Sequence, residues 1–209
     1  MKLYIIVGFL IIRILFNSGY ASQNDSVLIR VHFLHGSKPK CAFKETEDRW
    51  FGGVLGGHAG IEYESNKILN FQPKSRFHLF SNCSIINSKF SIHDTISFYE
   101  ILGGHHDSVK RTIIYIKISS TQKTKLDSIV KTYTKRSPYD YAFFGMRCGA
   151  AAHDVLAQID VIQKLSFKKT WRRIFYPRCL RRRLEALANI NHYKVVKYEG
   201  SIRRKWEKD

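Results

Sequence analysis

The order of the hydrophobic patterns along the chain is the strongest constraint on its fold. Short runs that alternate apolar with polar residues, the pattern of half-buried strands, come first, and runs with the three-and-four spacing of amphipathic helices follow. Strands are predicted at 26–34, 58–63, 68–72, 77–80, 84–86, 95–99, 111–119 and 192–198. Helices are predicted at 122–134, from residue 148 to about 162, and from 177 to 188, with a polar end after residue 203. Strands grouped ahead of helices predict an α+β fold.

The first 21 residues are predicted to be a secretory signal peptide. Lys2 precedes an apolar run, and Gly19 and Ala21 supply the small residues of a cleavage site. Arg13 interrupts the run and argues against a membrane span, because an arginine in hydrocarbon costs about 2.5 kcal/mol or more. We therefore expect a mature chain, 22–209, that forms one domain and is secreted or periplasmic. An uncleaved N-terminal anchor is the alternative.

The chain is strongly basic. It has 35 Lys and Arg against 17 Asp and Glu, a formal net charge of +18. Such an excess favours anionic partners. For an exported protein these are a cell-wall polymer or a membrane surface, and no nucleic-acid recognition motif is visible. The densest basic stretch, 168–183, fits either such a contact or a solvated face.

Four cysteines occur, at positions 41, 83, 148 and 179. Their spacing excludes a CxxC metal or redox motif. If Cys148 is a nucleophile it must stay reduced, so at most one disulfide is expected among Cys41, Cys83 and Cys179, with its pairing open.

Cys148 is the best candidate nucleophile. A glycine-broken loop from Tyr139 delivers it to the first turn of the predicted helix. A helix N-terminus carries roughly half a positive charge, which favours the thiolate, the form of cysteine that attacks carbonyls.

His58 is the matching candidate base. It follows the glycine-rich segment 50–57 and shares one strand face with Gly60 and Glu62. Across a predicted turn at 64–67, Asn70 should lie close to His58, where its amide oxygen can hold one ring tautomer. Glu62 is the alternative group to orient the imidazole.

Two other histidine positions are weaker candidates. His105, His106 and Asp107 can be pictured as metal ligands, but adjacent histidines in a glycine loop are usually solvated, so no metal site and no cofactor are predicted. His153 follows Cys148 by five residues and should point away from it around the helix.

Together these motifs resemble the circularly permuted papain-like hydrolases, the group that includes NlpC-like cell-wall peptidases and lecithin retinol acyltransferase. The similarity covers roughly residues 26–165 and depends on His58-Ala-Gly-Ile61, Asn70 and Arg147-Cys-Gly149, with Tyr139-Asp-Tyr141 ahead of the cysteine. The chain departs from the pattern in two places. Gly-Ala-Ala-Ala follows the cysteine instead of polar or aromatic residues, and the third site residue is Asn where relatives often have His, Glu or Gln.

The resemblance implies an antiparallel sheet packed against the cysteine-bearing helix. It also implies an exported cysteine hydrolase that cleaves an amide bond, in a cell-wall peptide or similar substrate, through a thioester. Cys148 would be the nucleophile, His58 the base and Asn70 the orienter, with Tyr141, Gly57 and Gly149 around the oxyanion and substrate pocket. Two alternatives stay open: a lipid acyl hydrolase or acyltransferase that uses the same residues, and a non-catalytic basic binding module.

Overall fold

The computed structural model describes residues 26–50, 52–75, 78–81 and 87–208. The predicted signal peptide and the predicted strand at 84–86 lie outside these residues. Within them, no helix has both the length and the apolar character needed to cross a membrane.

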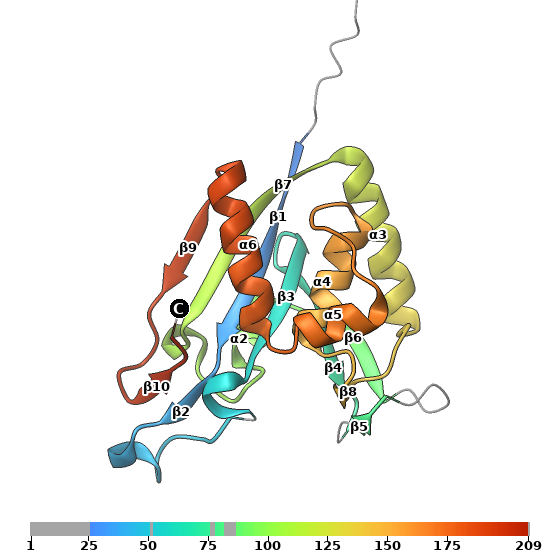
Figure 1. The fold of residues 1–209 in the computed structure, drawn as a ribbon. Coiled ribbons are helices and arrows are strands. Elements are labelled where there is room, and N and C mark those ends of the chain that lie inside the picture. The colour runs from blue at the N-terminus through green and yellow to red at the C-terminus, as the bar shows by residue number, and fades with distance from the viewer. Residues whose placement is uncertain (1–25, 51, 76–77, 82–86, 209) are drawn as a thin grey trace, which may run out of the picture.

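A six-stranded antiparallel sheet forms the centre of the molecule (Figure 1). Its strands are β1 (Ser26–His35), β3 (Gly57–Glu64), β4 (Lys67–Pro73), β6 (Ser88–His93), β7 (Arg111–Ser119) and β9 (Val195–Tyr198), in the order β6-β4-β3-β1-β7-β9. Two small sheets flank it. One pairs β2 (Ser37–Pro39) with β10 (Arg204–Trp206), and the other pairs β5 (His78–Phe80) with β8 (Ala142–Phe144).

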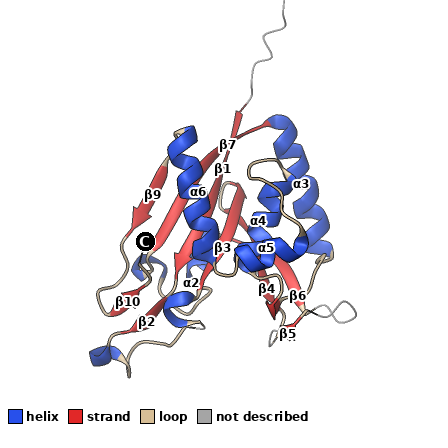
Figure 2. Ribbon diagram, in the orientation of Figure 1, coloured by secondary structure: helices blue, strands red, loops and turns tan. Residues whose placement is uncertain are grey.

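Helices cover one face of the sheet, as Figure 2 shows. They are α3 (Ser120–Lys135), α4 (Cys148–Gln158), α5 (Phe167–Arg173) and α6 (Pro177–Asn191). The main core forms between them and the sheet, with Val31 and Ile116 of the strands packed with Leu126, Leu156 and Leu184 of the helices. A smaller apolar cluster includes Leu34 and Ile68, together with Phe98 of the short helix α2 (Thr95–Glu100). The mixed α+β prediction, with an antiparallel sheet against the cysteine-bearing helix, is confirmed at this level.

The predicted hairpin is present as β3 and β4, with a register irregularity between Glu62 and Glu64. Gly60 pairs with Asn70, and Glu62 pairs with Ile68. Gly57 begins β3 with φ 97°, and a Cβ at this position would collide with the carbonyl oxygen of Leu34. The strand that carries His58 can therefore start this close to β1 only because residue 57 is glycine.

The strand predicted at 95–99 is wrong, because this segment is the helix α2. The Asp94 side chain accepts a hydrogen bond from the Ser97 amide at 2.8 Å and caps the helix. This local cap, with the burial of Phe98 and Tyr99, outweighs the strand preference of the β-branched and aromatic residues. The neighbouring strand β6 was not predicted.

Several segments toward the C-terminus also differ from prediction: α6 continues to Asn191 past the predicted residue 188, and β9 begins at Val195 instead of residue 192. The cysteine-bearing helix ends at Gln158 instead of near residue 162, and Asp160 adopts a left-handed φ of 58°. The end after residue 203 is not merely polar, because β10 pairs with β2 and places Arg204 and Glu207 in buried positions. Buried ionic groups need partners, and Arg181 of α6 supplies one to Glu207 at 3.0 Å.

Candidate active site

Cys148 and His58, ninety residues apart in the chain, meet at one edge of the core. Cys148 is the first residue of α4, and His58 is the second residue of β3. Both side chains line the same cavity, and after burial the charge of each is the largest influence on the pKa of the other. The structure thus brings together the predicted nucleophile and the predicted base.

The environment of each group favours an ion pair. Burial by itself would raise the pKa of the Cys148 thiol, but the charge and hydrogen bond of His58, the charge of Arg147 and the backbone amide of Ala59 hold it below its usual range. Burial would likewise lower the pKa of His58, yet its charge interaction and hydrogen bond with Cys148 and a hydrogen bond with Asn70 raise it. A lowered pKa of the thiol and a raised pKa of the imidazole both favour a thiolate beside an imidazolium.

Asn70 lies where the hairpin prediction places it. Its Oδ1 is 3.2 Å from Nε2 of His58. The amide nitrogen is held from the other side, 3.2 Å from the Ser91 carbonyl oxygen and 3.3 Å from His93 Nδ1. Strand β6 therefore fixes the amide, and His93 is a neighbour that the sequence analysis missed because it did not predict that strand.

Glu62, the alternative orienter, has other partners. Its carboxylate accepts hydrogen bonds from His32 Nε2 and Arg30 Nη1, both at 2.7 Å, and from the Asn66 amide at 3.0 Å. Burial alone would raise its pKa, but these hydrogen bonds lower it to about 2. The carboxylate is thus charged and engaged away from His58.

Tyr141 lies beside the nucleophile. Both residues line the same cavity, and the pKa of the Tyr141 hydroxyl responds to the charge of Cys148. Burial and the charge of Cys148 raise the pKa of Tyr141 well above its usual range, so the hydroxyl stays protonated at neutral pH. It can therefore donate a hydrogen bond to an oxyanion that forms next to the sulfur.

A cavity of about 420 Å³ opens onto this centre. Cys148 is only 4% exposed, but it lines this cavity together with His58, Tyr141 and Gly57, so a ligand inside the cavity can reach the sulfur. Gly149 does not line it, in contrast to the prediction. A Cβ at Gly149 would lie 3.0 Å from Cα of Pro177, so this glycine instead lets the start of α6 pack against α4.

Apolar side chains make up most of the cavity wall. They include Leu55, Ile101, Leu102, Phe143, Phe175, Tyr176 and Pro177. Arg147 adds a cation, with its guanidinium carbon 3.5 Å from the centre of the Phe175 ring and a hydrogen bond to the Phe175 carbonyl oxygen. The α5–α6 connection that carries Phe175 and Tyr176 was not recognised as part of the site, because only long-range packing brings it there.

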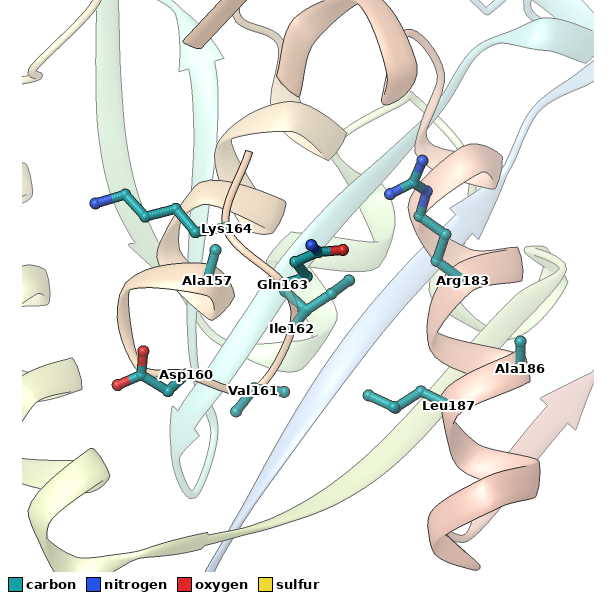
Figure 3. A pocket seen from close by; sticks show the side chains of 9 residues that line it. All are labelled: Ala157, Asp160, Val161, Ile162, Gln163, Lys164, Arg183, Ala186 and Leu187. Carbon is teal, nitrogen blue, oxygen red and sulfur yellow. The ribbon is translucent and has the colours of Figure 1, made fainter. Parts of the chain in front are cut away.

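A second cavity, of about 580 Å³, lies between the end of α4, the segment that follows it and α6 (Figure 3). Lys164, Arg183 and Asp160 contribute charged groups, while Val161 and Leu187 are apolar. None of the nine residues labelled in Figure 3 is a cysteine or a histidine.

Among the described residues, Cys41, Cys179 and His153 do not line the Cys148 cavity. Cys41 is an exposed free thiol and Cys179 a half-buried one, while Cys83 lies outside the described residues. His153 is fully buried in α4, and burial lowers its pKa to about 4, so it is neutral at physiological pH.

No family model, curated protein or solved structure matches this chain.

Proposed function

We propose that the protein is a cysteine hydrolase of the permuted papain-like type. Cys148 serves as nucleophile, His58 as general base and acid, and Asn70 as the group that orients the imidazole. The observation that carries this proposal is that His58 and Cys148 line one cavity large enough for an acyl group, with Asn70 Oδ1 3.2 Å from His58 Nε2 and opposite pKa shifts on the thiol and the imidazole.

The same geometry supports a two-step acyl transfer. The thiolate attacks an amide or ester carbonyl, and the oxyanion takes hydrogen bonds from the Cys148 amide and the Tyr141 hydroxyl. The imidazolium of His58 then protonates the leaving amine or alcohol, which departs and leaves a thioester. Water, deprotonated by His58, attacks the thioester, and the collapse of the second intermediate releases a carboxylic acid and the thiol.

The order of elements also supports the assignment to the permuted papain-like type. A strand with the histidine comes first, the orienting amide follows on its hairpin partner, and the cysteine opens a later helix that packs on that hairpin. These positions agree with those inferred from the resemblance.

The leading substrate class is an amide bond in a cell-wall peptide, processed by an exported enzyme. A second class, the acyl ester of a lipid, has its own support, because Leu55, Ile101, Leu102 and the aromatic residues make a mostly apolar wall. The basic composition suits the anionic surface of either substrate.

Thiol alkylation tests the reactive pair directly. At neutral pH, iodoacetamide should label Cys148 faster than Cys41, the exposed free thiol of the same molecule, and His58→Ala should slow only the labelling of Cys148. Peptide mapping of the labelled sites measures both rates in one sample. Equally slow labelling of Cys148 in both proteins would leave the non-catalytic binding module as the better reading.

Two substrates separate the enzyme classes. Purified cell wall and phospholipid vesicles are incubated in parallel with the native protein and with Cys148→Ala. Release of amino groups from cell wall supports the amidase, and release of fatty acid from vesicles supports the lipid hydrolase. Release that persists in Cys148→Ala comes from another source and counts against the proposal.

A further inference from the structure

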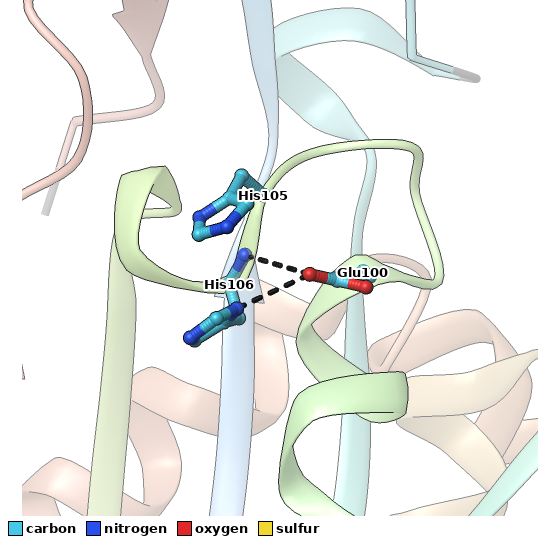
Figure 4. A group of neighbouring side chains, drawn as sticks. All are labelled: Glu100, His105 and His106. Atoms are coloured by element: carbon cyan, nitrogen blue, oxygen red, sulfur yellow. Dashed lines mark hydrogen bonds and ion pairs between the residues drawn. The ribbon is translucent and has the colours of Figure 1, made fainter.

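Three side chains that commonly bind metals converge on the connection between α2 and β7. They are Glu100 at the end of α2, His105 in the loop, and His106 at the start of a short 3-10 helix, residues 106–108 (Figure 4). One ligand atom from each lies within 4.8 Å of the other two. The two imidazole rings have centroids 4.4 Å apart, and His106 Nδ1 is 3.2 Å from a Glu100 oxygen.

The backbone beneath these side chains is well anchored. The buried residues Tyr99 and Val109 hold the two ends of the connection in the smaller apolar cluster. Within the connection, the Ser108 hydroxyl and the Ser108 amide both donate to the His105 carbonyl oxygen. The Arg111 guanidinium donates to the His106 carbonyl oxygen at 2.6 Å. The ligands therefore start from a fixed frame, which lowers the entropy lost when an ion orders them.

The donor set defines the class of ion. Two imidazoles and one carboxylate suit zinc and similar divalent ions, which bond such groups at about 2.0–2.2 Å. Ligand atoms on one tetrahedral ion are then roughly 3.4 Å apart, so side-chain rotations that move them about 1 Å complete the site. The Asp107 carboxylate, 3.3 Å from His106 Nε2, adds negative charge at its edge.

We propose that Glu100, His105 and His106 bind one zinc-like divalent cation, with water in the remaining position. Ile101 and Leu102, which lie between Glu100 and His105 in the chain, line the Cys148 cavity. An ion bound by Glu100 and the two histidines therefore links the two ends of the loop that carries Ile101 and Leu102. This link makes local unfolding of that part of the cavity wall less frequent. The binding site does not depend on the proposed hydrolase activity.

Zinc titration tests the site in a protein without the catalytic thiol. Calorimetry of Cys148→Ala with zinc chloride should give one ion per chain. Adding His105→Asn and His106→Asn, or Glu100→Gln alone, should weaken binding at least tenfold. His192→Asn, which changes an exposed histidine on the far end of α6, is the matched control and should leave binding unchanged.

Two further measurements identify the ligands and the effect on the wall. Cobalt bound in place of zinc should show ligand-field bands without a thiolate charge-transfer band, which excludes Cys41 and Cys179 as ligands. Hydrogen exchange should slow in residues 100–106 when zinc is added to Cys148→Ala, and not in the double histidine variant. Binding that survives the histidine substitutions, a thiolate band, or exchange that zinc does not slow would each overturn the proposal.

Discussion

Two histidine clusters on neighbouring strands of the same sheet behave in opposite ways. His58 contacts the neutral amide of Asn70 and lines a cavity with the thiol of Cys148, whereas His32 contacts the carboxylate of Glu62 at 2.7 Å and the hydroxyl of Tyr99 at 2.6 Å. Both imidazoles are buried. The pKa of His58 is raised, but burial lowers the pKa of His32 despite the opposing effect of Glu62.

The difference lies in what each imidazole can exchange a proton with. The negative charge of Glu62 is already shared with Arg30, so a neutral His32 donates to Glu62 and accepts from Tyr99. Next to His58 the acidic partner is a thiol that borders a cavity, and the orienting group, Asn70, is uncharged. One cluster is therefore suited to hold the sheet together, and the other to carry out chemistry.

The largest expected contrast comes from removing each imidazole. His58→Ala should lower the rate of hydrolysis about 10³-fold, because general-base catalysis contributes roughly 10²–10⁴-fold. Its thermal stability should change little by comparison. His32→Ala should lower the melting temperature while the folded fraction keeps near-native activity. Parallel measurement of kcat/KM and melting temperature checks this, and an equal loss of activity in both variants would erase the distinction.

The next contrast is between the two tyrosines. Tyr141→Phe should reduce kcat about 10²-fold with little change in KM, because removal of one oxyanion donor typically costs roughly 10²–10³-fold. Tyr99→Phe, which removes only the hydroxyl bonded to His32, should leave kcat within about twofold. Steady-state kinetics on an ester substrate measures both. A normal kcat in Tyr141→Phe would remove this residue from the oxyanion site.

Smaller effects are expected from the groups that orient the imidazoles. Asn70→Ala should lower kcat/KM roughly tenfold, in the range typical of orienting partners.

Glu62→Gln should instead cost about 1–3 kcal/mol of stability, because it leaves buried hydrogen-bonding groups poorly matched. The folded pKa of Glu62 lies below its unfolded value, so its stabilising effect is present above about pH 4.3 and is lost as pH falls toward 2. Urea unfolding between pH 7 and 3 should show a flatter profile for Glu62→Gln than for the native protein.

The smallest predicted effect is on the pH dependence of Cys148 alkylation. Because the pKa of Cys148 is lowered, its alkylation rate should fall less between pH 8 and 6.5 than that of an ordinary thiol with a pKa near 8.5, which loses most of its thiolate over this range. Cys41 in the same molecule serves as the reference thiol. In His58→Ala the Cys148 profile should shift toward alkaline pH, and in His32→Ala it should not. Profiles of the two cysteines that coincide in the native protein would contradict the ion pair.

The hydrophobic alternation along the chain predicted most of the central strands. The alternation in 26–34, 58–63, 68–72 and 111–119 gave the central strands, because period two specifies which residues face the core. The same period put Asn70 next to His58 across a short turn. The strand predicted at 95–99 failed because the Asp94 cap and the burial of Phe98 and Tyr99 favour a helix there.

The sequence by itself determined the kinds of reactive group, their local backbone settings and the hairpin that joins His58 to Asn70. Only the tertiary structure decided that Cys148 touches His58, that Glu62 turns to Arg30 and His32, and that Phe175 and Tyr176 close the cavity. The physical reason is the separation along the chain of the residues that interact. Strand and helix patterns depend on neighbours a few residues away, whereas the charge coupling of a thiol and an imidazole depends on burial and contacts between segments ninety residues apart.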